Sequence, residues 1–249
     1  MPDIQMKKYF IIVIIILLLA NCSMLRSKDE IGVEEKTVIL TFDDGPNIRH
    51  DITERLITVL DKHNVQGVFC FIGKIAEENP DIIRKVYESG HVIVNHSYNH
   101  DHPLSLRSEE RWEDLIKCDR VFGDILGIED YKSEYYRPPF GIINNSFKNE
   151  LLKNNIKLVP ASYYVNDVFF GPNRMEELLE DLIIKTEEEN CGIIILHEFI
   201  NLKNMPDDKE YYDNESRHNR SYVPELVDML IVELIARGYR FGMLRELEL

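Results

Sequence analysis

The chain has 249 residues, of which 44% are hydrophobic and 29% are charged, a balance typical of a globular protein with one substantial core. This composition excludes a disordered, collagen-like or coiled-coil chain. Lys and Arg total 29 against 44 Asp and Glu, a formal net charge of −15. Because a nucleic-acid site needs a concentrated positive field, we expect no nucleic-acid partner.

The N-terminal segment predicts export. Lys7 and Lys8 precede an apolar run, Phe10–Ala20, which is short for a bilayer span but has the length of a signal-peptide core. Cys22 follows in a setting that resembles a bacterial lipoprotein cleavage box, so we expect residues 1–22 to be a signal peptide of lipoprotein type, with Cys22 lipidated. Plain secretion and an uncleaved signal anchor are the alternatives. Each of the three places the domain outside the cytoplasm, membrane-anchored or secreted.

Residues 23–36 are charged and offer little to bury, so they predict a tether, with the catalytic domain at 37–249. Beyond Cys22 the chain holds an odd number of cysteines, which cannot all pair within it. Cys70 lies inside an apolar run and is expected to be a buried free thiol. We therefore predict no disulfide.

From Thr37 onward, short apolar runs alternate with segments of helical period. Seven runs are predicted to be strands: Thr37–Phe42, Gly67–Ile72, His91–Asn95, Glu134–Arg137, Ile156–Ser162, Gly192–His197 and Tyr239–Leu244. Apolar residues at helical spacing lie between them, as at Ile52, Leu56, Val59 and Leu60; at Leu178, Leu179, Leu182 and Ile183; and at Leu226, Met229 and Leu230. Helices are expected to start near Asn79 and Asn173 and to end near Gly90 and Gly238.

This alternation predicts an α/β fold, a parallel sheet with outer helices that is either closed as a barrel or open and doubly wound. The sequence has no dinucleotide or P-loop glycine pattern, which favours the barrel. One irregular, charged stretch, Asn201 to Tyr222, interrupts the pattern directly after a strand. It is either a solvated loop or a lid that contacts substrate.

Ionisable residues gather where the predicted strands end. They are Asp43 and Asp44, His96, Arg137, Asp167 and His197. Barrel enzymes collect catalytic groups from the carboxyl ends of several strands, whereas a structural barrel has no reason to place them there repeatedly. The pattern therefore favours an enzyme.

His96 and His100 lie one helical turn apart, close enough to share an ion, and a carboxylate from another strand end would complete three protein ligands. His102 nearby leaves an incidental His-rich stretch as the alternative. The adjacent acids Asp43 and Asp44 repel each other unless a cation or a base role absorbs the charge. One acid can bind the metal while the other takes a proton from water.

Four stretches together resemble motifs of a known family. They are Thr41–Pro46, His96–His100, Arg137–Gly141 and Leu196–His197, and they resemble, in order, four of the five motifs of the polysaccharide deacetylases, carbohydrate esterase family four, of the nodulation-factor deacetylase type. The resemblance covers the chain from about Thr37 to its C-terminus.

This resemblance implies a distorted (β/α) barrel of about seven parallel strands, a divalent metal ion such as zinc or cobalt, and hydrolysis of N-acetyl groups on a hexosamine polymer. Its metal ligands would be Asp44, His96 and His100. Asp43 would be the general base, oriented by Arg137, and His197 the general acid.

The resemblance also assigns substrate-binding positions to Pro139, Phe140 and Leu196, with the Phe140 amide stabilising the oxyanion. The fifth motif departs from the family: aligning it through Ser162 makes Asp167 the support of His197, but Ala161 and Val168 stand where the family has Trp. The aromatic wall of the acetyl pocket would then come from Tyr163, Tyr164, Phe169 or Phe170, unless these are core residues.

The sequence thus predicts a metal-dependent, extracytoplasmic N-deacetylase whose partners are an acetylated glycan and, through the N-terminus, a membrane. Peptidoglycan or an exopolysaccharide is expected ahead of chitin because export brings the domain to the cell envelope. The alternatives are an O-acetyl esterase acting on a polysaccharide and a catalytically inactive carbohydrate-binding lipoprotein.

Overall fold

The computed structural model describes residues 34, 36–160, 165–200 and 211–247. Its strands form one parallel sheet in the order β5-β4-β3-β2-β1-β6, and β7 pairs with the start of β1. Their bounds are β1 Thr37–Gly45, β2 Gly67–Phe71, β3 Val92–Asn95, β4 Tyr135–Tyr136, β5 Lys157–Leu158, β6 Gly192–His197 and β7 Arg240–Phe241. All seven predicted strands are present, but β4, β5 and β7 are shorter than predicted.

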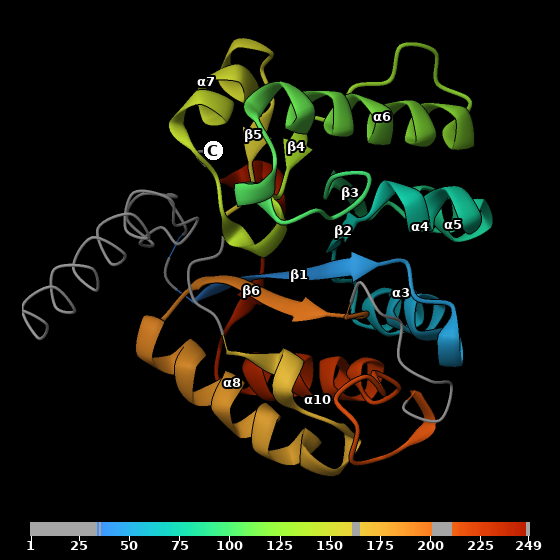
Figure 1. Cartoon of the computed structure of the whole chain (residues 1–249). Helices are drawn as coiled ribbons and strands as arrows, with labels where there is room; N and C mark the ends of the chain where they lie inside the picture. The colour runs from blue at the N-terminus through green and yellow to red at the C-terminus, as the bar shows by residue number, and fades with distance from the viewer. Residues whose placement is uncertain (1–33, 35, 161–164, 201–210, 248–249) are drawn as a thin grey trace, which may run out of the picture.

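Helices cover the outside of the sheet, which curls into a half-barrel (Figure 1). They are α3 Ile52–Lys62, α4 Gly73–Glu78, α5 Pro80–Glu88, α6 Ser108–Leu126, α7 Asn145–Lys153, α8 Met175–Glu189 and α10 Val223–Ala236. In Figure 1, α6 and α7 lie at one end of the sheet and α8 and α10 at the other. The predicted distorted (β/α) barrel is confirmed.

Local sequence signals explain the helix limits. Pro80 occupies the first turn of α5, where its missing N–H costs nothing. Gly90 and Gly238 take positive φ angles of 79° and 82° just beyond α5 and α10, as expected of chain-reversing caps. The helix expected near Asn173 starts at Met175, because a short 3-10 turn, Pro172–Arg174, comes first.

Alternate side chains of β1 face two different hydrophobic clusters. Val38, Leu40 and Phe42 join the main core together with side chains from α3, α8 and α10. Ile39 belongs to a different cluster, lined by strands and by the C-terminal segment. Since successive strand residues face opposite sides, Thr41 and Asp43 share the inner face with Ile39. The carboxyl end of that inner face is therefore polar.

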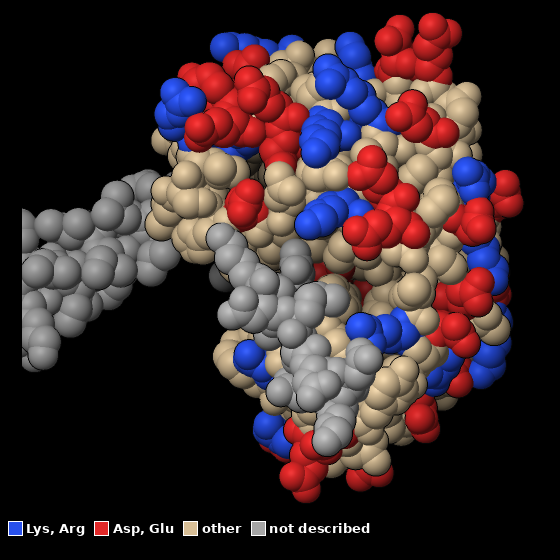
Figure 2. Space-filling model, turned by 45° about the vertical axis from the view of Figure 1, so that its right-hand side comes forward, with Lys and Arg blue, Asp and Glu red and all other residues tan. Residues whose placement is uncertain are grey.

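Cys70, Cys118 and Cys191, the three cysteines of the described chain, are buried and form no disulfide, in agreement with the prediction. In the ranges that the structure describes, no helix combines the length and the apolarity needed to cross a bilayer. The predicted signal peptide and Cys22 lie outside those ranges. Acidic and basic side chains are interspersed over the face seen in Figure 2, with no broad basic surface on it.

Candidate active site

Two consecutive carboxylates, Asp43 and Asp44, lie near the end of β1, and a β-bulge makes them point in different directions. The register with β2 shifts between Asp43 and Gly45, and Asp44 takes a positive φ of 71°. In a regular strand, neighbouring residues would face opposite sides, but a bulge re-aims one of them. Asp43 consequently contacts Arg137 while Asp44 contacts His96 and His100. The two acids thus belong to two different groups of the same site.

Asp44, His96 and His100 form the one group of His, Cys, Asp and Glu side chains, among the described residues, whose geometry suits a metal ion. Asp44 Oδ1 lies 3.3 Å from His96 Nε2 and 3.1 Å from His100 Nε2. The two histidines do not lie on a helix, as their spacing suggested. They lie in an irregular loop after β3, in which Ser97 and His100 have positive φ angles. His102 is not part of the group.

Hydrogen bonds to side chains hold this loop in place of a helix. Asn95 Oδ1 accepts from the Ser97 amide at 2.9 Å, and Ser97 Oγ accepts from the His100 amide at 2.9 Å. Asp114, on α6, accepts from the Tyr98 amide at 2.6 Å. Side-chain acceptors of this kind replace the intrahelical bonds and fix the positions of both imidazoles.

The protonation pattern of His96 suits an ion between these groups. His96 Nδ1 lies 2.8 Å from the Arg137 carbonyl oxygen, which can only accept, so Nδ1 carries the proton. In the neutral ring, Nε2 then presents a lone pair to Asp44 Oδ1, and two acceptors 3.3 Å apart repel each other. A divalent cation bound by both, and by His100, would remove that repulsion. The donor set therefore fits the implied metal.

Burial and charge act in opposite directions on the metal-binding group. Burial alone raises the pKa of Asp44, but the charge and the hydrogen bond of His100 oppose it most strongly, and the pKa lies well below its usual range. Burial lowers the pKa of His100, but Asp44 raises it by more, so the net shift of this pKa is upward. Asp44 is consequently a carboxylate over the ordinary pH range, as a metal ligand must be.

Arg137, directly after β4, orients the other acid. It is fully buried, and its Nη1 lies 3.0 Å from Asp43 Oδ1 and 3.3 Å from Asp43 Oδ2. The same nitrogen donates to Thr41 Oγ1 at 2.9 Å, and Nη2 donates to the Pro160 carbonyl at 3.2 Å. Since these contacts span the inner face of the sheet, the Asp43 carboxylate has little freedom to rotate.

His197, the last residue of β6, pairs with Asp167. His197 Nδ1 lies 2.8 Å from Asp167 Oδ1, and the His197 amide donates to Asp167 Oδ2 at 2.8 Å. Burial lowers the pKa of His197, but Asp167, followed by Asp44 and Asp43, raises it to about 9. On the strand next to β1, His197 is paired in register with Asp43, so the imidazole and the Asp43 carboxylate share one end of the barrel.

The residues predicted to bind substrate lie in different surroundings. The Phe140 ring is 56% exposed and lies 4.8 Å, centroid to centroid, from the His100 ring. Leu196 is fully buried in the main core, paired in register with Phe42, so its side chain faces away from the site. Pro139 is buried beside a small pocket.

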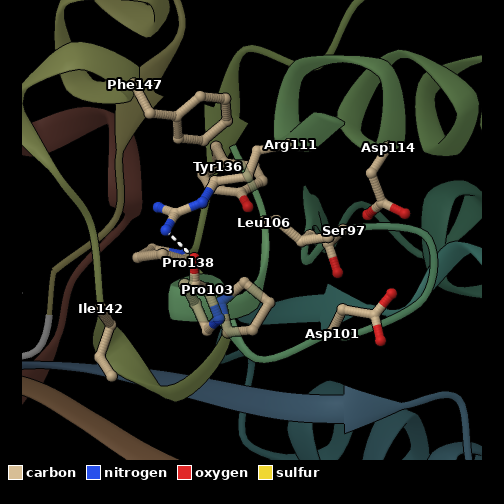
Figure 3. Close-up of a pocket in the computed structure, with 11 residues that line it drawn as sticks. Ser97, Asp101, Pro103, Leu106, Arg111, Asp114, Tyr136, Pro138, Ile142 and Phe147 are labelled. Carbon is tan, nitrogen blue, oxygen red and sulfur yellow. Dashed lines mark hydrogen bonds between the residues drawn. The ribbon is translucent and has the colours of Figure 1, made fainter. Parts of the chain in front are cut away.

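That pocket lies between the loop of the two histidines and the segment after β4 (Figure 3). Ser97, Asp101 and Asp114 lie on one side of it, and the Arg111 guanidinium donates to the Pro103 carbonyl within it. The lining does not include Asp43, Asp44 or His197. The pocket therefore adjoins the catalytic groups without containing them.

The aromatic candidates for the acetyl pocket differ in their exposure. Phe170 is buried in the main core, whereas Phe169 is 57% exposed, one turn from Asp167. Tyr163 and Tyr164 lie outside the described residues. Of the two described candidates, only Phe169 is open to a ligand.

Two buried charged residues near the site were missed by the sequence analysis. Arg220 contacts Asp167, and no spacing or motif distinguishes it from Arg217 in the same charged stretch. Glu198 follows His197, and burial raises the pKa of its carboxyl to about 8, although the hydrogen bond from Thr53 acts in the opposite direction. A β-carbon at Gly45 would lie only 1.7 Å from Glu198 Oε1, so any larger residue there would displace this carboxyl.

Together these groups provide a basic, an acidic and an ion-binding function at one end of the sheet. Asp43 can accept a proton, His197 can donate one, and the Asp44 group can hold a Lewis acid. This combination suits hydrolysis of an acyl bond.

Comparisons with known proteins agree with this chemistry. A family model described as polysaccharide deacetylase matches residues 30–159. The chain is 33% identical over 120 residues to a peptidoglycan-N-acetylglucosamine deacetylase of Bacillus cereus, an alignment that covers 48% of this chain and 39% of that relative. It is 26% identical over 214 residues to the peptidoglycan-N-acetylmuramic acid deacetylase PdaA of Bacillus subtilis, covering 86% of this chain and 72% of that one.

The fold has a solved counterpart as well. A crystal structure of the Bc1960 peptidoglycan N-acetylglucosamine deacetylase superposes with a TM-score of 0.68 at 23% identity and covers 84% of this chain and 86% of its own. At this identity the superposition supports the fold alone.

Proposed function

This chain belongs to the polysaccharide deacetylase family, and from that premise we propose that it is a metal-dependent hydrolase that removes N-acetyl groups from an amino-sugar polymer of the cell envelope. The observation that carries the proposal is the meeting of three sets of side chains at one end of the sheet: Asp43 with Arg137, Asp44 with the two histidines, and His197 with Asp167.

Asp43 is the general base in this proposal. Its carboxylate takes a proton from the water that attacks the acetyl carbonyl carbon, and Arg137 keeps the accepting oxygens in a fixed direction. A divalent ion held by Asp44, His96 and His100, with zinc or cobalt as the candidates, would supply a Lewis acid for the carbonyl and a lowered pKa for the water. The Phe140 amide is the proposed donor to the oxyanion.

His197 is the proposed general acid. Because Nδ1 is engaged with Asp167 Oδ1, the proton available for transfer is the one on Nε2. That proton passes to the sugar nitrogen as its bond to the acetyl carbon breaks, which leaves acetate and a free amine. A pKa of about 9 keeps the imidazole protonated at neutral pH, as an acid requires.

We place the enzyme outside the cytoplasm, with residues 1–22 as a lipoprotein-type leader lipidated at Cys22, 23–36 as a tether and 37–249 as the catalytic domain. The names of the relatives, which act on peptidoglycan, support an envelope glycan as substrate. The aligned part spans 39% of the first of these relatives. We therefore propose only the class of polymer as substrate, and not the particular substrate of that relative.

Acetate release from a panel of glycans tests the proposal. The panel would contain peptidoglycan, oligomers of N-acetylglucosamine and an O-acetylated xylan, each assayed alongside the metal content of the protein. Release from the N-acetylated glycans alone supports the proposal. Release from xylan alone would replace it with the O-acetyl esterase alternative, and no release from any glycan by metal-loaded protein would favour the carbohydrate-binding one.

A further inference from the structure

The stretch after β6 ends in a buried segment, although residues 212–215, just before it, are exposed. His218, Asn219 and Arg220 are all buried, and Arg220 is only 1% exposed. Asn201 to Tyr222 is the stretch for which the sequence left both alternatives open. Since a buried arginine loses its hydration, its guanidinium must be fully engaged by the protein.

Arg220 is engaged by the residues that surround the proposed acid. Its Nη2 contacts Asp167 Oδ2, and its Nε donates to the His197 carbonyl at 2.9 Å. Its Nη1 lies within donating distance of the carbonyls of Asp167, at 3.0 Å, and Phe170, at 3.3 Å, and of the Tyr222 hydroxyl, at 2.7 Å. One planar group thus joins the segments on either side of the Asp167–His197 pair.

These contacts occupy the Asp167 carboxylate from both sides. Oδ1 faces His197 Nδ1, whereas Oδ2 receives the His197 amide and Arg220 Nη2. Rotation of the carboxylate would break several charge-assisted hydrogen bonds at once. A guanidinium suits this place because its N–H groups have a fixed planar arrangement, which an ammonium lacks.

The charges around Asp167 also indicate a role for Arg220. Asp167 is completely buried, and its two ion-pair partners among the described residues are His197 and Arg220. When His197 gives up its proton, Arg220 is the cation that remains beside the carboxylate. A buried carboxylate without any cation would be strongly destabilised. Arg220 therefore keeps Asp167 ionised while His197 changes its charge.

We propose that Arg220 is a positioning residue of this active site: it locks the Asp167 carboxylate in the orientation that directs His197, and so ties the stretch after β6 to the chemistry. The proposal rests on the proposed role of His197 as acid. It concerns the geometry of the guanidinium, so lysine at this position is expected to be an incomplete substitute.

The test compares Arg220→Met and Arg220→Lys with Arg55→Met as the matched control. Arg55, on α3, donates to the Ser221 carbonyl at 2.9 Å, so its loss weakens the anchoring of the same segment without touching Asp167. With a tetramer of N-acetylglucosamine as the probe, we expect kcat to fall about 10²-fold in Arg220→Met and roughly tenfold in Arg220→Lys, with little change in KM. Arg55→Met should retain the wild-type kcat.

A double-mutant cycle separates positioning from general destabilisation. If Arg220 acts through Asp167, Arg220→Met should cost less than about threefold in kcat when it is introduced into Asp167→Asn. A loss as large there as in the wild type would overturn the proposal. The double variant lacks both buried charges, so it remains informative if Arg220→Met alone does not fold.

A spectroscopic measurement makes the outcome independent of activity. In the wild type, the His197 Nδ1 proton should give a low-field NMR signal, assigned by its absence in His197→Ala. We expect the signal to be lost in Arg220→Met, weakened or shifted in Arg220→Lys and unchanged in Arg55→Met. A wild-type signal and a wild-type kcat in Arg220→Lys would overturn the proposal. If the wild type deacetylates no glycan, the proposed function fails, yet this signal still decides the role of Arg220.

Discussion

Replacing Asp167 by Asn should change the pH dependence of catalysis in a defined direction. The substitution keeps the size of the side chain and removes its charge. His197 has a pKa of about 9, against an ordinary value of 6.5, because Asp167, with smaller contributions from Asp44 and Asp43, more than offsets burial. Without the Asp167 carboxylate, burial opposes the imidazolium and the Arg220 cation next to it loses its partner.

The sign of the effect follows from the role of the acid. A general acid works only while protonated, so the alkaline limb of the profile of kcat against pH reports the pKa of His197. In Asp167→Asn that pKa should fall from about 9 toward the ordinary 6.5. The alkaline limb should then move to lower pH by roughly two units, which corresponds to about 3 kcal/mol of lost stabilisation of the imidazolium. His197→Ala should cost roughly 10²–10⁴ in rate at neutral pH.

Acetate release measured across the pH range checks this. Asp228→Asn is the matched control because Asp228 also pairs with a histidine, His63, on the surface formed by α3 and α10. It makes the same change in net charge and should leave the limb where it is. If Asp167→Asn also leaves the alkaline limb in place while His197→Ala removes activity, Asp167 is not the group that raises the pKa of His197.

The remaining predictions concern the ion, the two acids and the membrane. Chelation, or His96→Ala, should abolish acetate release and lower the bound metal found by elemental analysis, while the thermal unfolding of the domain stays cooperative; full activity in metal-free protein would contradict this. Asp43→Asn should retain the metal and lose activity, whereas Asp44→Asn should lose the metal itself, and equal metal loss in both would rule out separate roles for the two acids. Cys22→Ser should release the protein from membranes in a fractionation assay if a lipid is the anchor; a variant that stays membrane-bound with an intact N-terminus would identify the apolar segment as the anchor.

The sequence predicted those parts of the site that depend on strand ends. The carboxyl ends of parallel strands meet at one edge, so Asp43 and His197 could be expected to lie together once their strands were recognised, and they are partners in register. The seven strands were recognisable because each is a short apolar run between polar segments. Their pairing order needed the structure, since periodicity carries no information about neighbours.

Other parts depend on backbone geometry that spacing does not reveal. The separation of four residues between His96 and His100 fits a helical turn, but bonds from Asn95, Ser97 and Asp114 stabilise an irregular loop instead. The bulge at Asp44 is likewise invisible in a run that continues as a strand to Gly45. The contact of Arg220 with Asp167 joins residues 53 positions apart, and a charged stretch gives no sign of which arginine is buried.

The order of strands across the sheet gives the site a direction. The loop with the two histidines follows β3, Asp43 lies near the end of β1, and His197 ends β6, so the histidines proposed to bind the ion and the proposed acid lie on opposite flanks of β1. An amide bond is itself polar, with oxygen at one end and nitrogen at the other. A substrate hydrolysed as proposed must therefore enter with its carbonyl oxygen toward the β3 side and its nitrogen, and hence the sugar ring, toward β6. The same bond reversed would present its nitrogen to groups that have no proton to give, so strand order alone selects one of the two orientations of the glycan.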